Sequence, residues 1–202
     1  MTAMADVIPN FDPEDRKRKA EAATAAADKA APMASTPIKY NDDGSVAWDN
    51  MWDSFCVLAK EGGPAHRATL LGPDETSDVH SPGYQFAQQE IIRGIYLVSG
   101  LKAQADKPGW IAVECQSEGM AAWLADAGIV ENVQVRNEGS RLFVPCGERF
   151  GIKGEIKNVV TVVAKTTHYW ADHVPDEVKT TMKIEEQLSG LGRRIKKLFG
   201  RP

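Results

Sequence analysis

Apolar residues recur at spacings of three and four in several stretches of the chain, which is the spacing of one face of an α-helix. The pattern predicts helices over residues 46–60, from Pro82 to near Gly100, from Ser117 to Gly128, and over residues 155–173. Ser81 and Ser117 stand where a hydroxyl can cap the first helical turn, and glycines follow where the chain leaves the helix.

Residues 155–173 carry an ambiguous pattern. The run Val159–Val163 has the β-branched density of a buried strand. Apolar residues from Ile156 to Trp170 also form a helical face over four turns, which exceeds the usual strand limit of about 10 residues. The length favours a helix whose valines are held by packing rather than by propensity.

Shorter apolar runs predict strands at His66–Leu71, Trp110–Cys115, Val133–Arg136 and Leu142–Val144. The last two flank Asn137–Ser140, which is typical of a hairpin turn. Strand–helix–strand units imply parallel pairs, whereas the hairpin adds an antiparallel pair. We therefore expect an α/β or α+β fold, with a small mixed sheet of about four strands and helices mainly on one face.

The apolar face of each predicted element identifies the expected core. These positions are Trp52, Phe55, Ile91, Ile95, Val113, Trp123, Leu124, Val135 and Val163. Replacing Phe55 or Trp123 by alanine is expected to lower the free energy of unfolding by about 3–5 kcal/mol.

Charge and composition divide the chain into three segments. Residues 1–39 have no net charge and include an alanine-rich stretch without large apolar side chains, so we expect a leader that is disordered or orders on a partner. Residues 40–174 carry a net charge of −7 and should form one compact domain. Residues 175–202 carry a net charge of +3 and form a basic amphipathic C-terminal segment.

The overall composition excludes several classes of protein. Of the 202 residues, 43% are hydrophobic, which suits one folded domain with tails. The three cysteines do not suggest a disulfide framework, and no secretory leader or run of about 18 apolar residues is present. The expected compartment is the cytoplasm, with peripheral contact at the inner face of a membrane left open. An acidic body argues against nucleic-acid binding.

The loop after the first predicted helix is the first candidate ligand site. Gly63 lets the backbone approach a ligand, His66 can exchange a proton near neutral pH, and Arg67 offers a fork for carboxylate or phosphate. The Gly-Lys-Ser/Thr ending of a phosphate loop is absent. A helix stop followed by a strand start explains the same glycine-rich stretch, so both interpretations stay open.

Cys115 and Ser117 form the second candidate site, where a predicted strand ends and a helix begins. The N–H groups of a helix start favour an anion or a thiolate. Cys115 shares its side of the strand with Ile111 and Val113, which instead indicates a small buried side chain. Ser117 serves either as a helix cap or as a ligand contact.

No metal site, nucleophilic triad or cofactor is predicted. His168 and His173 are five residues apart, and on a helix this spacing should separate their imidazoles widely. Cys146 lies close to Arg149, either as an accessible thiol or as an incidental loop cysteine. The glycine pattern of dinucleotide-binding proteins does not follow any predicted strand.

The C-terminal segment combines an apolar stripe with basic side chains. Its docking candidates are Leu188, Leu191, Arg193, Arg194, Ile195, Lys196, Lys197 and Leu198. Such a segment can enter a groove of a protein partner, lie on an anionic membrane surface, or pack back on the acidic body.

Two functional hypotheses follow. The first is a non-catalytic accessory or assembly protein that docks to larger protein partners through its terminal segments, with homo-oligomer formation left open. The second is a small enzyme, or a protein that binds an anionic small ligand, using the His66–Arg67 loop and the Cys115–Ser117 helix start.

Overall fold

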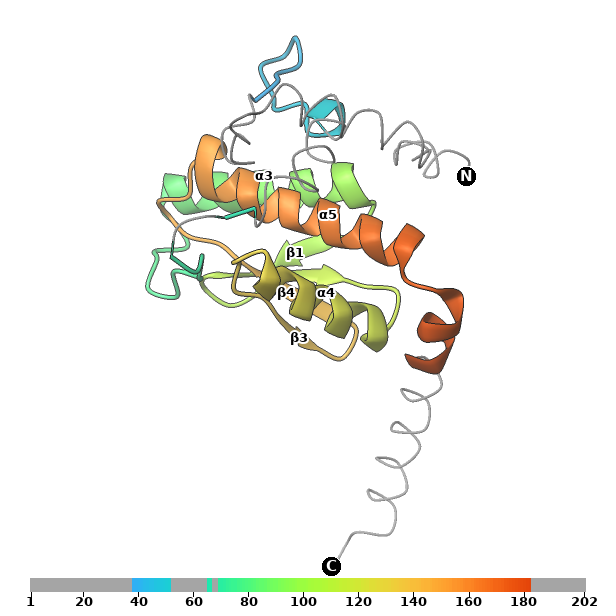
Figure 1. Ribbon diagram of the computed structural model, residues 1–202. Helices are drawn as coiled ribbons and strands as arrows, with labels where there is room; N and C mark the ends of the chain where they lie inside the picture. Colours follow the sequence, from blue (N-terminus) through green and yellow to red (C-terminus); the bar gives the residue numbers. More distant parts are fainter. Residues whose placement is uncertain (1–37, 52–64, 67–68, 183–202) are drawn as a thin grey trace, which may run out of the picture.

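The computed structural model describes residues 38–51, 65–66 and 69–182. In these residues a four-stranded sheet packs against helices (Figure 1). The long helices are α3 (Pro82–Ser99), α4 (Glu118–Val130) and α5 (Lys157–His173). Short turns are η2 (Asp49–Met51) and η3 (Ile152–Ile156), and a last helical stretch covers residues 176–182. The predicted mixed fold of helices and a small sheet is confirmed.

The caps of α3 and α4 are those that the sequence predicts. The Ser81 hydroxyl accepts a hydrogen bond from the Tyr84 N–H at 3.2 Å, and Pro82 opens α3. The Ser117 hydroxyl accepts from the Met120 N–H at 3.0 Å. Gly100 ends α3 at φ 70°, a left-handed conformation that glycine adopts without a steric penalty.

The sheet has the order β1 (Ala103–Ala105), β2 (Trp110–Glu114), β4 (Arg141–Pro145) and β3 (Arg136–Glu138). All three pairings in this sheet are antiparallel, so the expected parallel pairs within it are wrong. The reason is that β1 joins β2 through a tight turn and no helix crosses over between them. Gly139, at φ 58°, opens the two-residue turn of the predicted hairpin.

The predicted strand at His66–Leu71 is also wrong for the residues that the structure describes. His66, Thr69 and Leu70 have no strand pairing there. Leu71 makes a single parallel bridge to Val133, and its N–H donates to the Asn132 carbonyl at 3.1 Å. The described residues of this stretch therefore lie beside the end of α4 without forming a strand.

The helices cover one face of the sheet, as expected. Alternate residues of β2 and β4 join the helices in the main core: Ile111, Val113, Leu142 and Val144. A separate buried cluster on the opposite face contains Trp110, Ala112 and Phe143. There the Arg136 guanidinium lies 4.3 Å from the Phe143 ring centroid, so arginine rather than a helix covers the aromatic rings.

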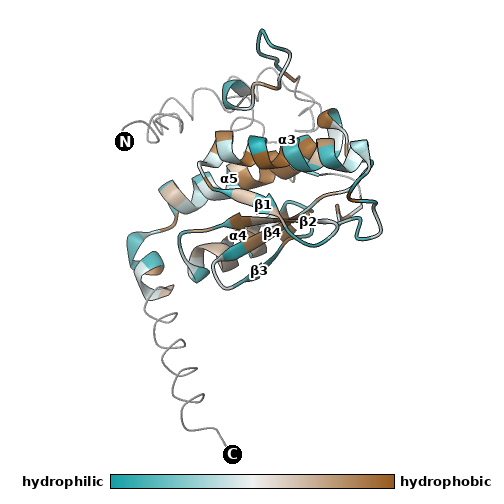
Figure 2. Cartoon of the chain, turned by 180° about the vertical axis from the view of Figure 1, so that it is seen from behind, coloured by the Kyte–Doolittle hydropathy of each residue, from teal (hydrophilic) through white to brown (hydrophobic). Residues whose placement is uncertain are grey.

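Helix α5 lies between α3 and α4 (Figures 1 and 2). Twelve of its 17 residues are buried, on all sides of the helix. Its helical conformation confirms the helix, rather than a strand, that the sequence predicts over residues 155–173. Val160 and Val162, two residues apart and so on opposite sides of the helix, are 0% and 2% exposed. The packing of two flanking helices thus compensates for the low helix propensity of valine.

The first predicted helix does not begin at residue 46. Val46 bridges to Tyr40, and a single turn, η2, covers Asp49–Met51. The turn residues Asn41 to Gly44 fold this stretch into a small loop, because the Asp43 carboxylate accepts hydrogen bonds from the Ser45 N–H and hydroxyl. Residues 52–60 of the predicted helix lie outside the described part of the chain.

Most described core predictions are confirmed. Buried positions include Ile91, Ile95, Val113, Leu124, Val135 and Val163. Trp123 is only partly buried, and its ring centroid lies 5.9 Å from that of Trp170. Trp52 and Phe55 lie outside the described residues. Within the described ranges, no helix is both long enough and apolar enough to cross a membrane.

Burial of Lys157, the first residue of α5, predicts a pH dependence. The side chain is 1% exposed, and burial lowers the pKa of its ammonium from 10.5 to about 8. Between these two pH values, Lys157 is therefore mostly protonated in the unfolded chain and mostly neutral in the folded protein. We expect the free energy of unfolding to rise from pH 8 to 10.5, relative to Lys157→Met, with the full penalty present below pH 8. Parallel profiles for the two proteins in chemical denaturation would contradict this.

Candidate functional site

His66, from the first candidate loop, is held at the junction of α4 and α5. The backbone N–H of His66 donates to the Glu131 carbonyl at 3.3 Å, and the backbone carbonyl of His66 accepts from the Asn132 side chain at 3.1 Å. The Asn158 side-chain nitrogen lies 2.9 Å from His66 Nδ1. An amide nitrogen only donates, so Nδ1 accepts and the proton of the neutral ring lies on Nε2.

Glu131, at the end of α4, ties the same loop to α5. Its carboxylate accepts from the Ala65 N–H at 2.9 Å and from the Lys165 ammonium. Glu131 is 7% exposed, so both interactions lie away from water. A buried carboxylate with a backbone donor and an ammonium partner has the contacts that burial of a charge requires.

These contacts define a polar cluster of His66, Glu131, Asn132, Asn158 and Lys165, in which Glu131 and Asn158 are buried and the other three are partly buried. Asn158 and Lys165 are seven residues apart on α5 and so lie on the same side of the helix. The cluster fixes the chain at residues 65–66 against two helices. Its carboxylate and ammonium neutralise each other, which suits a structural tie better than proton transfer.

The second candidate site has structural roles in this fold. Ser117 caps α4, and the Cys115 N–H donates to the Ser140 carbonyl at 2.9 Å. The Cys115 side chain packs against the main core, and burial raises the pKa of its thiol to about 11. A thiol with this pKa stays protonated at neutral pH and is a poor nucleophile.

The two candidate stretches lie at opposite ends of α4. Ser117 precedes the helix, whereas Glu131 and Asn132, which bond His66, follow it. A helix of 13 residues is about 20 Å long at 1.5 Å per residue. One small ligand therefore cannot contact both His66 and Ser117. Gly63 and Arg67 lie outside the described residues, as do all eight docking candidates of the C-terminal segment.

Cys146 is not the accessible thiol that its place beside Arg149 suggests. It is 0% exposed and belongs to the main core, and burial raises the pKa of its thiol to about 12. Its carbonyl accepts from the Asp74 N–H at 3.0 Å. The loop cysteine therefore faces the interior, where the sequence alone left both interpretations open.

Both described cysteines should resist thiol reagents while the protein is folded. At pH 7.5 we expect Cys115 and Cys146 to react far more slowly in the native protein than in denaturant, because native burial keeps both thiols protonated. Iodoacetamide labelling followed by peptide mass spectrometry separates the individual sites. If Cys115 in the native protein reacts as fast as it does in denaturant, it is again a candidate nucleophile.

The histidines at the end of α5 lie closer together than their spacing predicts. The ring centroids of His168 and His173 are 5.4 Å apart, and Tyr169 lies 5.0 Å from His173. His173 is the last residue of α5, where the helix ends. Within the described ranges, no group of three metal-ligating side chains occurs.

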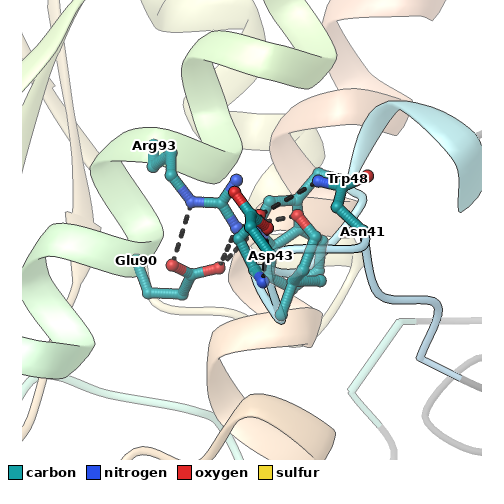
Figure 3. Close-up of polar contacts among 7 residues, drawn as sticks. Asn41, Asp43, Trp48, Glu90 and Arg93 are labelled. Atoms are coloured by element: carbon teal, nitrogen blue, oxygen red, sulfur yellow. Dashed lines mark hydrogen bonds and ion pairs between the residues drawn. The ribbon is translucent and has the colours of Figure 1, made fainter.

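The sequence did not single out a second polar cluster, which anchors residues 38–51 on α3 (Figure 3). Trp48 Nε1 donates to the Glu90 carboxylate at 2.8 Å, and Arg93 donates to the same carboxylate and to the Val46 carbonyl, the latter at 2.7 Å. Glu90 and Arg93 are three residues apart on a helix, which the sequence reveals. Nothing local shows that Trp48 reaches them.

Two shallow hollows lie on the described surface. One of about 310 Å³ is lined by Ile92, Tyr96, Lys102, Ala103, Gln104 and Glu114, between α3 and β1. The other, of about 360 Å³, is lined by Leu71, Pro73, Asp74, Arg149, Phe150 and Glu155. In the second hollow, Asp74 and Glu155 accept hydrogen bonds from Thr76 and from the Gly151 N–H respectively, so both carboxylates are already used by the protein.

Comparison with known proteins adds no assignment, because no protein-family model matches the chain and no curated protein sequence matches it.

Proposed function

We propose that this protein is a non-catalytic accessory protein that docks to a larger protein through its terminal segments, chiefly the C-terminal one. The observation that carries the proposal is the anchoring of residues 176–182. Met182 lies against Gly119 at the start of α4, so close that a β-carbon on Gly119 would stand 2.8 Å from the Met182 β-carbon. This contact holds Met182, the last described residue before the C-terminal docking candidates, against the start of α4.

The path from α5 to this anchor supports the proposal. Val174 adopts an extended conformation and Pro175 follows, so α5 stops and the chain turns. The Lys179 ammonium then donates to the Ala171 carbonyl at 2.9 Å, which ties the last helical stretch to the end of α5. The docking candidates, Leu188 to Leu198, begin six residues beyond Met182 and lie outside the described part of the chain.

The body itself supports a scaffold role. Cys115, Ser117 and Glu131 hold the fold together through the contacts given above. The alternative, a small enzyme or anion-binding protein, requires the His66 and Cys115–Ser117 stretches to share one site. Their separation by the length of α4 argues against that arrangement.

Binding by the C-terminal segment should depend on its apolar stripe. In affinity capture from the native source, we expect one protein to be retained by the full chain and at least tenfold less by Leu188→Ser/Leu191→Ser/Ile195→Ser. Each buried leucine or isoleucine contributes about 1.5–3 kcal/mol, and 1.4 kcal/mol is already a factor of ten. The matched control, Leu70→Ser, changes an exposed leucine of the body.

Two outcomes would contradict the proposal. Equal capture by the full chain and the triple variant would move docking to another surface. Loss of capture together with a lower unfolding midpoint would show that the stripe packs on the body. Sedimentation with anionic vesicles separates a membrane role, which added salt should weaken because exposed charges are screened over about 8 Å.

A further inference from the structure

Strand β1 leaves one edge of the sheet open. It pairs with β2 on one side, and the sheet order places no described strand on the other. The Glu114 N–H donates to the Lys102 carbonyl at 2.8 Å, and the Asp106 N–H donates to the Trp110 carbonyl at 3.2 Å. Lys102 and Asp106 thus direct their backbone groups toward β2, and Gln104 between them does the same.

The intervening residues therefore direct their backbone groups outward. Alternate residues of a strand bond to opposite sides, so the N–H and C=O groups of Ala103 and Ala105 point away from β2. Lys102, Gln104, Ala105 and Asp106 are exposed, and Ala103 is half-buried. A row of outward backbone groups on an exposed edge can pair with another extended strand.

We propose that two copies of this chain pair their β1 strands antiparallel about Gln104 and join their sheets into one. In this register Ala103 of one copy lies opposite Ala105 of the other, so their outward N–H and C=O groups bond each other reciprocally. The relation is twofold, and each contact therefore occurs twice.

Charge complementarity favours this register over its neighbours. It also favours a second copy of this chain as the partner of β1. Antiparallel pairing about Gln104 sets Lys102 opposite Asp106 of the second copy, and Asp106 opposite its Lys102. These residues occupy non-hydrogen-bonded positions, where opposite side chains lie about 4.5–5.5 Å apart at Cβ. Pairing about Ala103 sets Lys102 opposite Gln104 instead, and pairing about Ala105 sets Asp106 opposite Gln104. Neither shifted register matches opposite charges.

The neighbouring groove favours the same contact. Ile92 and Tyr96 of α3 line it beside Ala103, and Tyr96 is 47% exposed. The small alanine side chains lie on the helix-covered face of β1 and leave room for apolar groups of the second copy. Burial of Tyr96 would add apolar contact to the backbone pairing.

Charge reversal tests the register directly. In sedimentation equilibrium we expect the full chain to approach twice the mass of one chain as concentration rises. Lys102→Asp and Asp106→Lys should each weaken dimerisation about tenfold, because each places two like-charged pairs across the interface. The double variant Lys102→Asp/Asp106→Lys restores both opposite-charge pairs and should recover the dimer.

A proline at the open edge tests the backbone contact separately. Ala105→Pro removes an N–H that β2 does not use, so we expect a monomer whose unfolding midpoint equals that of the full chain at concentrations where the full chain is monomeric. A monomeric full chain at all concentrations would overturn the proposal. So would a dimer that neither the charge reversals nor Ala105→Pro weakens, since it would form through another surface. Failure of the double variant to recover the dimer would overturn the register.

Discussion

Replacing Trp48 by alanine should lower the free energy of unfolding by about 3–5 kcal/mol, the usual effect of removing a buried tryptophan. Trp48 is 0% exposed and belongs to the main core. Its indole approaches α3 at Gly94, where a β-carbon would stand 3.1 Å from Nε1. The substitution removes this packing and also leaves the Glu90 carboxylate without its indole donor.

Two variants separate packing from hydrogen bonding in this prediction. Trp48→Phe keeps an aromatic ring but loses the donor to Glu90, and should have a smaller effect than Trp48→Ala. Trp123→Ala serves as a second comparison: because Trp123 is only partly buried, its loss should be smaller than the value of about 3–5 kcal/mol expected from the sequence. Chemical denaturation measures the free energy of unfolding of all three variants, and its dependence on denaturant concentration should stay the same. A loss below about 1 kcal/mol for Trp48→Ala would mean that residues 38–51 do not stabilise the body.

Replacing Glu131 by alanine should lower the free energy of unfolding by about 3–5 kcal/mol, as expected when one partner of a buried ion pair is removed. The substitution leaves the Lys165 ammonium without its carboxylate and the Ala65 N–H without its acceptor. Lys165 has a side-chain exposure of 13%, so water reaches it only in part.

A double-mutant cycle tests whether Glu131 and Lys165 act as a pair. In Glu131→Ala/Lys165→Met the buried charge is removed together with its partner, so the combined loss should be clearly smaller than the sum of the single losses. Additive losses would show that Glu131 stabilises the fold through the Ala65 N–H alone.

The elements that the sequence predicts correctly are those specified by neighbouring residues. α3 has a serine cap, a proline at its first position and a left-handed glycine at its end, all visible in the sequence. The hairpin of β3 and β4 is confirmed with its glycine turn, but β3 lies at Arg136–Glu138 and shares only Arg136 with the predicted strand Val133–Arg136. These signals act over a few residues and do not depend on the rest of the fold.

The arrangement of these elements depends on distant contacts. The sequence separates β1 and β2 by a short turn but does not mark residues 103–105 as a strand, because two alanines and a glutamine have no strand pattern. Without β1, the helix–strand order suggested parallel crossovers. Trp48 followed the spacing of a helix, but its buried position depends on Gly94 and Glu90, more than forty residues away.

The sequence indicates candidate site residues only one at a time. The chemistry of its side chain makes His66 a candidate, yet its partners Glu131 and Asn158 lie 65 and 92 residues further along the chain. Ser117 was predicted as a cap because a cap is local. Whether a polar residue binds a ligand or another part of the protein depends on which distant groups the fold brings to it.

The most direct test of a docking role for the C-terminal segment is competition by a peptide. A synthetic peptide of residues 175–202 is added to the protein while it is bound to its captured partner, and the displaced protein is measured. We predict full displacement by this peptide and none by a peptide of the same composition in scrambled order, because the apolar stripe depends on residue order. Retention of the protein at saturating peptide would contradict docking through this segment.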